Sequence, residues 1–147
     1  MRALFYHADR AWSGRARAFA AAARGLAGRG YQVTFVCQPD SAVEQRLSPS
    51  GYDIVPVAGR PGVGTGFRLR RLMHDRFVEV VFVHTEREHL AAALALRLAE
   101  RGAVIRRLGA GESLAVARSS RTARRLAAAG ALQTLLVDEP PDRKSVV

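Results

Sequence analysis

One stretch, Glu79–Ala99 (EVVFVHTEREHLAAALALRLA), constrains the fold of this chain more than any other. It opens with the apolar run Val80–Val83, which is typical of a strand buried on both faces of a parallel sheet. A helix is predicted after this strand, with an apolar stripe along one side. The stripe consists of Leu90, Leu94 and Leu98, widened by Ala91 and Ala95. The polar pair His84–Thr85 therefore lies at the carboxyl end of a central strand, where open α/β sheets bind their ligands.

The rest of the chain alternates strand and helix signals. Further strands are predicted at 3–6, 32–37, 53–57, 103–108 and 133–137, with helices following Ser13, Ser41, Gly66 and Gly111. This alternation predicts an α/β fold with a doubly wound, mostly parallel sheet. We expect one domain over residues 1–140 and a disordered tail over 141–147. Pro56 cannot donate to a ladder, so it places strand 53–57 near an edge.

The net charge of +10 indicates attraction to an anionic partner. Lys144 is the only lysine among the 23 basic residues, aromatic residues make up 7% of the chain, and no run alternates basic with aromatic residues. This pattern argues against nucleic acid as the partner. Arg118, Arg121 and Arg125 fall near one helical face, which is either a solvated face or a peripheral contact with an anionic membrane. No apolar run is long enough to span a bilayer.

The single cysteine, Cys37, excludes an internal disulfide framework and favours a cytoplasmic location. Because Phe35 and Val36 precede it, we expect a buried core thiol. His84 and His89 have no third ligand at a suitable spacing, so we expect no metal site. His89 is predicted to be a solvated helix residue.

Three segments are candidates for ligand contacts besides His84–Thr85, which is either a ligand group or a hydrogen-bonded rim pair. Ser13, Gly14 and Arg15 form a turn into a helix, which is either a modest anion site or an ordinary turn. Because the Rossmann fingerprint is absent there, we expect no NAD or FAD cofactor. Arg107 ends the strand after His84 and is predicted to contact a phosphate or carboxylate, or to form a surface ion pair.

The glycine-rich segment Gly59–Gly66 (GRPGVGTG) superficially resembles a phosphate-binding loop. It lacks the GKS or GKT ending of a Walker motif and follows a short, edge-like strand. We interpret it as a flexible linker rather than a nucleotide cradle.

Taken together, these residues resemble the N-terminal, acceptor-side domain of retaining GT-B glycosyltransferases of the family-4 type. The resemblance covers roughly residues 1–140. It is carried by the opening RALFYH, by the helix end LAGRGYQVTFVC and by EVVFVHTEREHLAAALALRLAERGAVIRRLGAGE. The phrase A-x-x-G-H-x-V of the family is matched by residues 27–33, and the second histidine of its V-H-x-H is matched by His84.

The sequence departs from that family in three respects. Phe82 replaces the first histidine of V-H-x-H, and Ser13-Gly14 replaces a Gly-Gly pair. The chain also stops where the family continues into a second domain, which binds the nucleotide of the donor sugar. We therefore expect that donor-binding half to be absent here or carried on a separate chain, and this domain to be catalytically incomplete alone.

The resemblance implies specific roles for the candidate residues. His84 would lie beside the transferring sugar, while Gly14 and Arg15 would approach the donor diphosphate. Transfer would proceed from a nucleotide-sugar donor to a glycosyl acceptor, with retention and without a metal or other cofactor. The alternative is a non-catalytic α/β module that binds a phosphorylated ligand or a partner protein.

Overall fold

The structure, a computed structural model, describes residues 1–108 and 134–138. Strands and helices alternate from the first residues onward. The elements are β1 (Arg2–Tyr6), α1 (Gly14–Gly28), β2 (Gln32–Cys37), α2 (Ala42–Leu47), β3 (Asp53–Pro56), α3 (Val63–Asp75), β4 (Val80–Val83), α4 (Glu86–Ala99), β5 (Ala103–Leu108) and β6 (Thr134–Asp138). The predicted helices at 112–129, the arginine stripe within them, the boundary at residue 140 and the tail lie outside the described residues.

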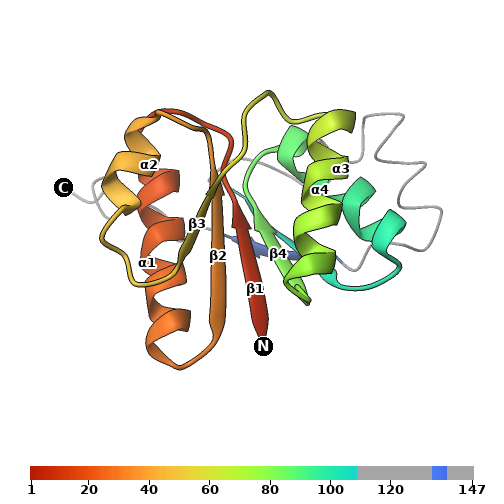
Figure 1. The fold of residues 1–147 in the computed structure, drawn as a ribbon, viewed down its shortest axis with the longest axis horizontal. Helices are drawn as coiled ribbons and strands as arrows, with labels where there is room; N and C mark the ends of the chain where they lie inside the picture. The colour runs from red at the N-terminus through yellow and green to blue at the C-terminus, as the bar shows by residue number, and fades with distance from the viewer. Residues whose placement is uncertain (109–133, 139–147) are drawn as a thin grey trace.

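The six described strands form one parallel sheet in the order β3-β2-β1-β4-β5-β6. The order reverses between β1 and β4, because β2 and β3 extend to one side of β1 whereas β5 and β6 extend to the other side of β4. Helices α1 and α2 cover one face of the sheet, and α3 and α4 cover the other (Figure 1). The predicted doubly wound α/β fold is thus confirmed, and β3 is an edge strand as Pro56 indicated.

An aromatic stack fills the core beneath α1 and α2. Phe5 of β1 stacks on Phe82 of β4 with ring centroids 4.6 Å apart, and on Phe35 of β2 at 6.0 Å. Phe19 of α1 meets the edge of the Phe5 ring at 5.2 Å. Cys37 is buried in the same cluster, and burial raises the pKa of its thiol to about 11. The expected core thiol is confirmed.

The leucine stripe of α4 does not pack on the sheet. Small residues cover the sheet instead, because they let the helix approach it closely. The buried apolar side chains of α4 are Ala91, Ala92, Ala93, Ala95 and Leu96. Leu90 and Leu94 are half-buried and Leu98 is 38% exposed, so this stripe runs along the outer side of the α3–α4 contact.

The glycine-rich segment is not a flexible linker throughout, because its second half, Val63–Gly66, forms the first turn of α3. Thr65 is buried and its hydroxyl donates to the Arg60 carbonyl at 2.8 Å, which fixes the entry into the helix. A Cβ on Gly66 would lie 3.3 Å from the Ala91 carbonyl oxygen. Gly66 therefore serves the close packing of α3 on α4, whereas a Cβ on Gly59 or Gly64 would meet no atom within 4 Å.

The turn between α4 and β5 depends on Gly102, which has φ of +96°. A Cβ there would lie 2.6 Å from Leu96 Cδ2 and 3.3 Å from the Glu79 carbonyl oxygen. We expect Gly102→Ala to lower the free energy of unfolding by about 2 kcal/mol, because it combines backbone strain with overpacking. Urea denaturation measures this change.

The matched control for that substitution is Gly25→Ala within α1, where an added Cβ meets no atom within 4 Å. Alanine there should raise the free energy of unfolding by about 0.5–1 kcal/mol through helix propensity. If both variants shift the denaturation midpoint in the same direction, close packing at Gly102 is not what holds this turn.

Candidate functional site

Two histidines lie side by side where the strand order reverses. His7 directly follows β1, and His84 directly follows β4, so both lie at the carboxyl edge of the sheet on the α1 side. Their ring centroids are 6.0 Å apart. His84 also stacks on Phe19 at 3.7 Å. In open α/β sheets this reversal opens a crevice at which ligands bind.

His84 is held as a neutral imidazole. Its Nε2 lies 3.1 Å from the Arg15 carbonyl oxygen, which can only accept, so Nε2 carries the proton. The pKa of His84 is lowered from 6.5 to about 3, above all by burial; the bond to the Arg15 carbonyl opposes this shift, and the charges of His7, Arg107 and Arg15 add to it. Nδ1 makes no hydrogen bond within the described residues, which leaves a lone pair as the group that His84 can offer a ligand.

Glu88 ties together the two loops that carry these histidines. It is 1% exposed. One carboxylate oxygen accepts from the N–H of Ala8 at 2.8 Å, and the other accepts from the N–H groups of His84 at 2.9 Å and Thr85 at 3.0 Å. All three donors belong to the β1–α1 and β4–α4 turns. A single buried side chain therefore fixes the spacing of the two halves of the edge.

Three of the predicted contact residues lie at the starts of helices, namely Thr85, Ser13 and Gly14. Thr85 caps α4, and its hydroxyl accepts from the Glu88 N–H at 3.2 Å in a complete capping box. Ser13 caps α1 by accepting from the Ala16 N–H at 3.3 Å, and Gly14 is the first residue of that helix. These hydroxyls hold the helix starts at the carboxyl edge, where free N–H groups and the helix dipole favour an anion.

The two arginines at the end of β5 differ in environment. Arg106 is 5% exposed and its Nε donates to the His84 carbonyl at 3.2 Å, whereas Arg107 is half-buried. The prediction that His89 is a solvated helix residue is wrong, because this residue of α4 is half-buried. Burial first, and the charge of Arg106 second, lower the pKa of His89 to about 4.

The structure brings five of the six predicted contact residues to one place and adds three that sequence reasoning missed. Ser13, Gly14, Arg15, His84 and Thr85 lie on the two converging turns, and Arg107 is near enough for its charge to lower the pKa of His84. The missed residues are His7, Glu88 and Arg106. Two of them could have been found from the sequence. Glu88 completes the capping-box pattern Thr85-x-x-Glu88, and His7 directly follows its strand as His84 does.

His7 is the least satisfied polar side chain at this edge. It is 1% exposed, and neither ring nitrogen has a hydrogen-bond partner among the described residues. Burial lowers its pKa, while the charges of Glu88 and Asp9 oppose that shift. A buried imidazole normally finds a partner, so His7 offers a second point for a bound water or ligand.

Stability is expected to fall as the solution becomes acidic, because His7, His84 and His89 are all harder to protonate in the folded chain than in the unfolded one. A depressed folded pKa gives stability that is complete above 6.5 and is lost as the pH falls toward the folded value. Between pH 6.5 and the folded pKa of about 3, His84 alone should lower the free energy of unfolding by about 1.4 kcal/mol per pH unit. Urea denaturation from pH 7 to pH 5, in steps of about half a pH unit, tests this dependence.

The variant His84→Gln should reduce that acid slope, whereas His74→Asn, at an exposed ring on α3, is the matched control and should leave it unchanged. A slope that is identical in both variants would mean that His84 is not the group responsible.

Elsewhere, an open cavity of about 540 Å³ lies at the opposite, amino edge of the sheet. It is lined by residues such as Arg2, Tyr31 and Arg76, and Arg2 begins the strand that His7 follows, so the cavity and the two histidines lie at opposite ends of the strands. Among the described residues no group of three or more His, Cys, Asp or Glu side chains could hold a metal ion. No described helix is both long and apolar enough to cross a membrane.

Comparison with known proteins adds a family and a set of similar folds. The sequence profile of Glycosyltransferase Family 4 matches residues 12–108. MurG of Acinetobacter baumannii is similar in structure, with 18% identity and a TM-score of 0.64 over 96% of this chain and 42% of MurG. Anabaena HepE in complex with UDP-glucose has 14% identity and a TM-score of 0.65 over 94% of this chain and 43% of HepE.

A third similar structure is a putative UDP-N-acetylglucosamine 2-epimerase from Listeria monocytogenes, with 11% identity and a TM-score of 0.61. The match covers 94% of this chain and 39% of the Listeria protein. The chain thus spans about two fifths of each of these three proteins, and at such low identity the likeness shows the fold alone. No curated protein matches the sequence.

Proposed function

Because the chain belongs to Glycosyltransferase Family 4, we propose that it is the acceptor-side half of an enzyme that transfers a sugar from a nucleotide-sugar donor. Residues 1–140 would form this domain, and a donor-binding domain, on the same or another chain, would complete the cleft at the carboxyl edge of the sheet. Alone, the domain would be catalytically incomplete.

The observation that carries this proposal is the convergence of the β1–α1 and β4–α4 turns around His84 at the reversal of the strand order. His84 is neutral, and its Nε2–H is committed to Arg15. We propose that Nδ1 accepts a hydrogen bond from a hydroxyl of the transferring sugar. A histidine with this protonation orients the sugar and does not serve as a proton donor at that atom.

The start of α1 is the proposed contact of the donor diphosphate. Gly14 presents a helix N–H group there, whereas the Ser13 N–H donates to the Ala11 carbonyl at 2.9 Å, and the exposed Arg15 adds a cation. Negative charge develops on the leaving diphosphate during transfer, and fixed donors and cations stabilise it. Arg107 would add a second cation from β5. In line with the family resemblance, we propose retention of configuration and no metal requirement.

The donor class is proposed by analogy with a relative of the same fold. HepE was solved in complex with UDP-glucose. A nucleoside diphosphate sugar is accordingly the proposed donor here, with a cytoplasmic location and peripheral contact with an anionic membrane as further parts of the proposal. The acceptor is a glycosyl acceptor.

The second candidate function is a non-catalytic module that binds a phosphorylated ligand or a partner protein. It is favoured by the burial of both imidazoles, since His7 and His84 are 1% and 4% exposed. A binding module would need the helix starts and the arginines at the edge, but not the lone pair of His84.

A donor assay separates the two. The protein, together with a donor-binding domain where that is encoded apart, is incubated with radiolabelled UDP-sugars and a bacterial membrane or cytosolic extract as the source of acceptor. Label that moves to an acceptor supports transfer. Tight binding of UDP by this domain alone, measured by calorimetry, with no labelled product from any donor would favour the binding module.

A further inference from the structure

An apolar row lies on the surface where α3 meets α4. It consists of Val63, Phe67, Leu90, Leu94 and Leu98, which we call the α3–α4 seam. The members on each helix are four residues apart, so each helix presents its row along one side. Val63 is 66% exposed, Phe67 52% and Leu98 38%. Half of the large apolar side chains that are exposed in the described part of the chain therefore lie on this seam.

Cationic side chains flank the seam at both ends. At one end, a cavity of about 450 Å³ is lined by apolar residues that include Val63, Leu90 and Leu94, with Arg60 and Arg87 beside them. At the other end, a cavity of about 600 Å³ is lined by Phe67 and Leu98. Its remaining lining is Arg70, Arg71, His74, Asp75, Ala99 and Arg101.

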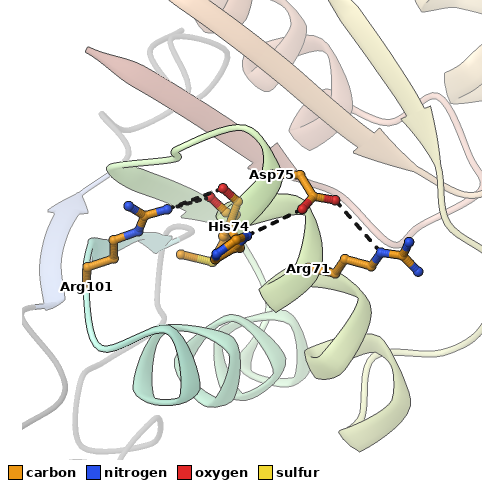
Figure 2. A network of polar contacts seen from close by, with 5 residues as sticks. Arg71, His74, Asp75 and Arg101 are labelled. Carbon is orange, nitrogen blue, oxygen red and sulfur yellow. Dashed lines mark hydrogen bonds and ion pairs between the residues drawn. The ribbon is translucent and has the colours of Figure 1, made fainter.

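The charge at this second cavity is strongly one-sided. Asp75 is the only acidic residue in the two linings, and it lies 3.8 Å from Arg71 and 3.5 Å from the His74 ring (Figure 2). Arg101 closes the end of α3 by donating to the carbonyls of Met73 and His74 at 3.3 and 3.4 Å. Arg70 and Arg87 have no ion pair within the described residues.

Charge complementarity selects the occupant of such a surface. A second copy of this chain would bring a net charge of +10 against the same arginines, which is repulsive. Nucleic acid would use the arginines but gains little from exposed valine and leucine, and Phe67 is the only aromatic residue in the seam on which a base could stack. A bilayer with acidic lipids satisfies both features, because apolar side chains enter the interface while arginines meet the head groups.

We propose that the α3–α4 seam docks on the surface of a membrane that contains acidic lipids. This gives the peripheral membrane contact of the proposed function a specific surface, distinct from the arginine stripe at residues 118–125. Helix α4 begins one residue after Thr85, so docking through the starts of α3 and α4 would hold the carboxyl edge of the sheet close to the membrane. An acceptor anchored in the bilayer could then reach the site.

Sedimentation with vesicles tests the proposal without any sugar transfer. One set of vesicles contains phosphatidylglycerol and phosphatidylcholine in equal parts, and the other contains phosphatidylcholine alone. We expect binding to the first set only. The double variant Phe67→Ser/Leu98→Ser should bind about tenfold more weakly, and so should Arg70→Gln/Arg87→Gln.

Two control variants match these changes on other surfaces. Tyr31→Ser removes an exposed ring at the amino edge of the sheet, and Arg24→Gln/Arg29→Gln removes the same charge from the α1 side. Both should bind the mixed vesicles within about twofold of the unchanged protein. Circular dichroism confirms that every variant is folded.

Three results would overturn the proposal. The first is no binding to the mixed vesicles. The second is an equal loss of vesicle binding in the α1-side control Arg24→Gln/Arg29→Gln, which would mean that net charge alone accounts for the binding. The third is a dimer in light scattering that Phe67→Ser/Leu98→Ser converts to a monomer, which would assign the seam to a second copy. None of these bears on sugar transfer by His84, so the two proposals fail separately.

Discussion

Replacing Glu88 with alanine is expected to lower the free energy of unfolding by about 4 kcal/mol, because three buried or half-buried N–H groups lose their acceptor at once. The donors belong to Ala8, His84 and Thr85. Two of these bonds are local to the start of α4, but the third joins the end of β1 to α4 across 80 residues of sequence. Urea denaturation at neutral pH measures the loss.

Glu44→Ala is the matched control for Glu88→Ala. Glu44 also sits three residues after a helix cap, Ser41, but its carboxylate accepts from the N–H of the adjacent Asp40 at 2.6 Å and reaches no distant strand. Its removal should cost about 1 kcal/mol, as for a helix cap alone. Equal costs in the two variants would contradict the role of Glu88 in joining the two turns.

Hydrogen exchange gives an independent measure of the same contact. In Glu88→Ala the Ala8 N–H should exchange much faster through local opening of the turn, whereas the N–H of Phe5 within β1 exchanges only when the whole protein unfolds and should quicken only by the loss of global stability. An unchanged Ala8 rate would mean that another group holds this turn.

The fold could be predicted from sequence because its signals are local. The run Val80–Val83, the glycine after α1 at position 30 and the cap at Ser13 each act within a few residues, and each lies where the structure has an element boundary. The inward side of α4 could not be predicted in this way. Its leucines and alanines both form stripes, and the packing of α3, which brings Gly66 against Ala91, decides which stripe faces the sheet.

The candidate site was predictable in position but not in partners. A polar pair after a central strand predicts the carboxyl edge, so His84 and Thr85 could be found from the sequence. The carboxylate of Glu88 reaching Ala8, and Arg106 reaching the His84 carbonyl, depend on which strands are neighbours. Sequence spacing places β1 and β4 far apart, and only the sheet order brings them together.

If the chain transfers a sugar as proposed, in an enzyme completed by its donor-binding domain, His84→Gln is expected to lower kcat by about 100-fold or more, because it would remove the proposed acceptor for a hydroxyl of the sugar in the transition state. Glutamine can still donate to the Arg15 carbonyl from its terminal amide, so the structural tie is kept while the lone pair of Nδ1 is lost. Alanine is a poorer test, since the ring stacks on Phe19 and its removal leaves a buried cavity that destabilises the fold.

His84→Asn supplies the converse substitution, because its amide oxygen takes the place of Nδ1 while the tie to Arg15 is lost. If the lone pair is what matters, Asn should keep kcat within about tenfold of the unchanged enzyme and exceed Gln at every pH. With a pKa near 3, His84 stays neutral through the working range, so its contribution to kcat should be flat from pH 5 to 8. A titration of kcat near 6.5 that vanishes in both variants would instead make His84 an acid–base group, and the orienting role would have to be abandoned.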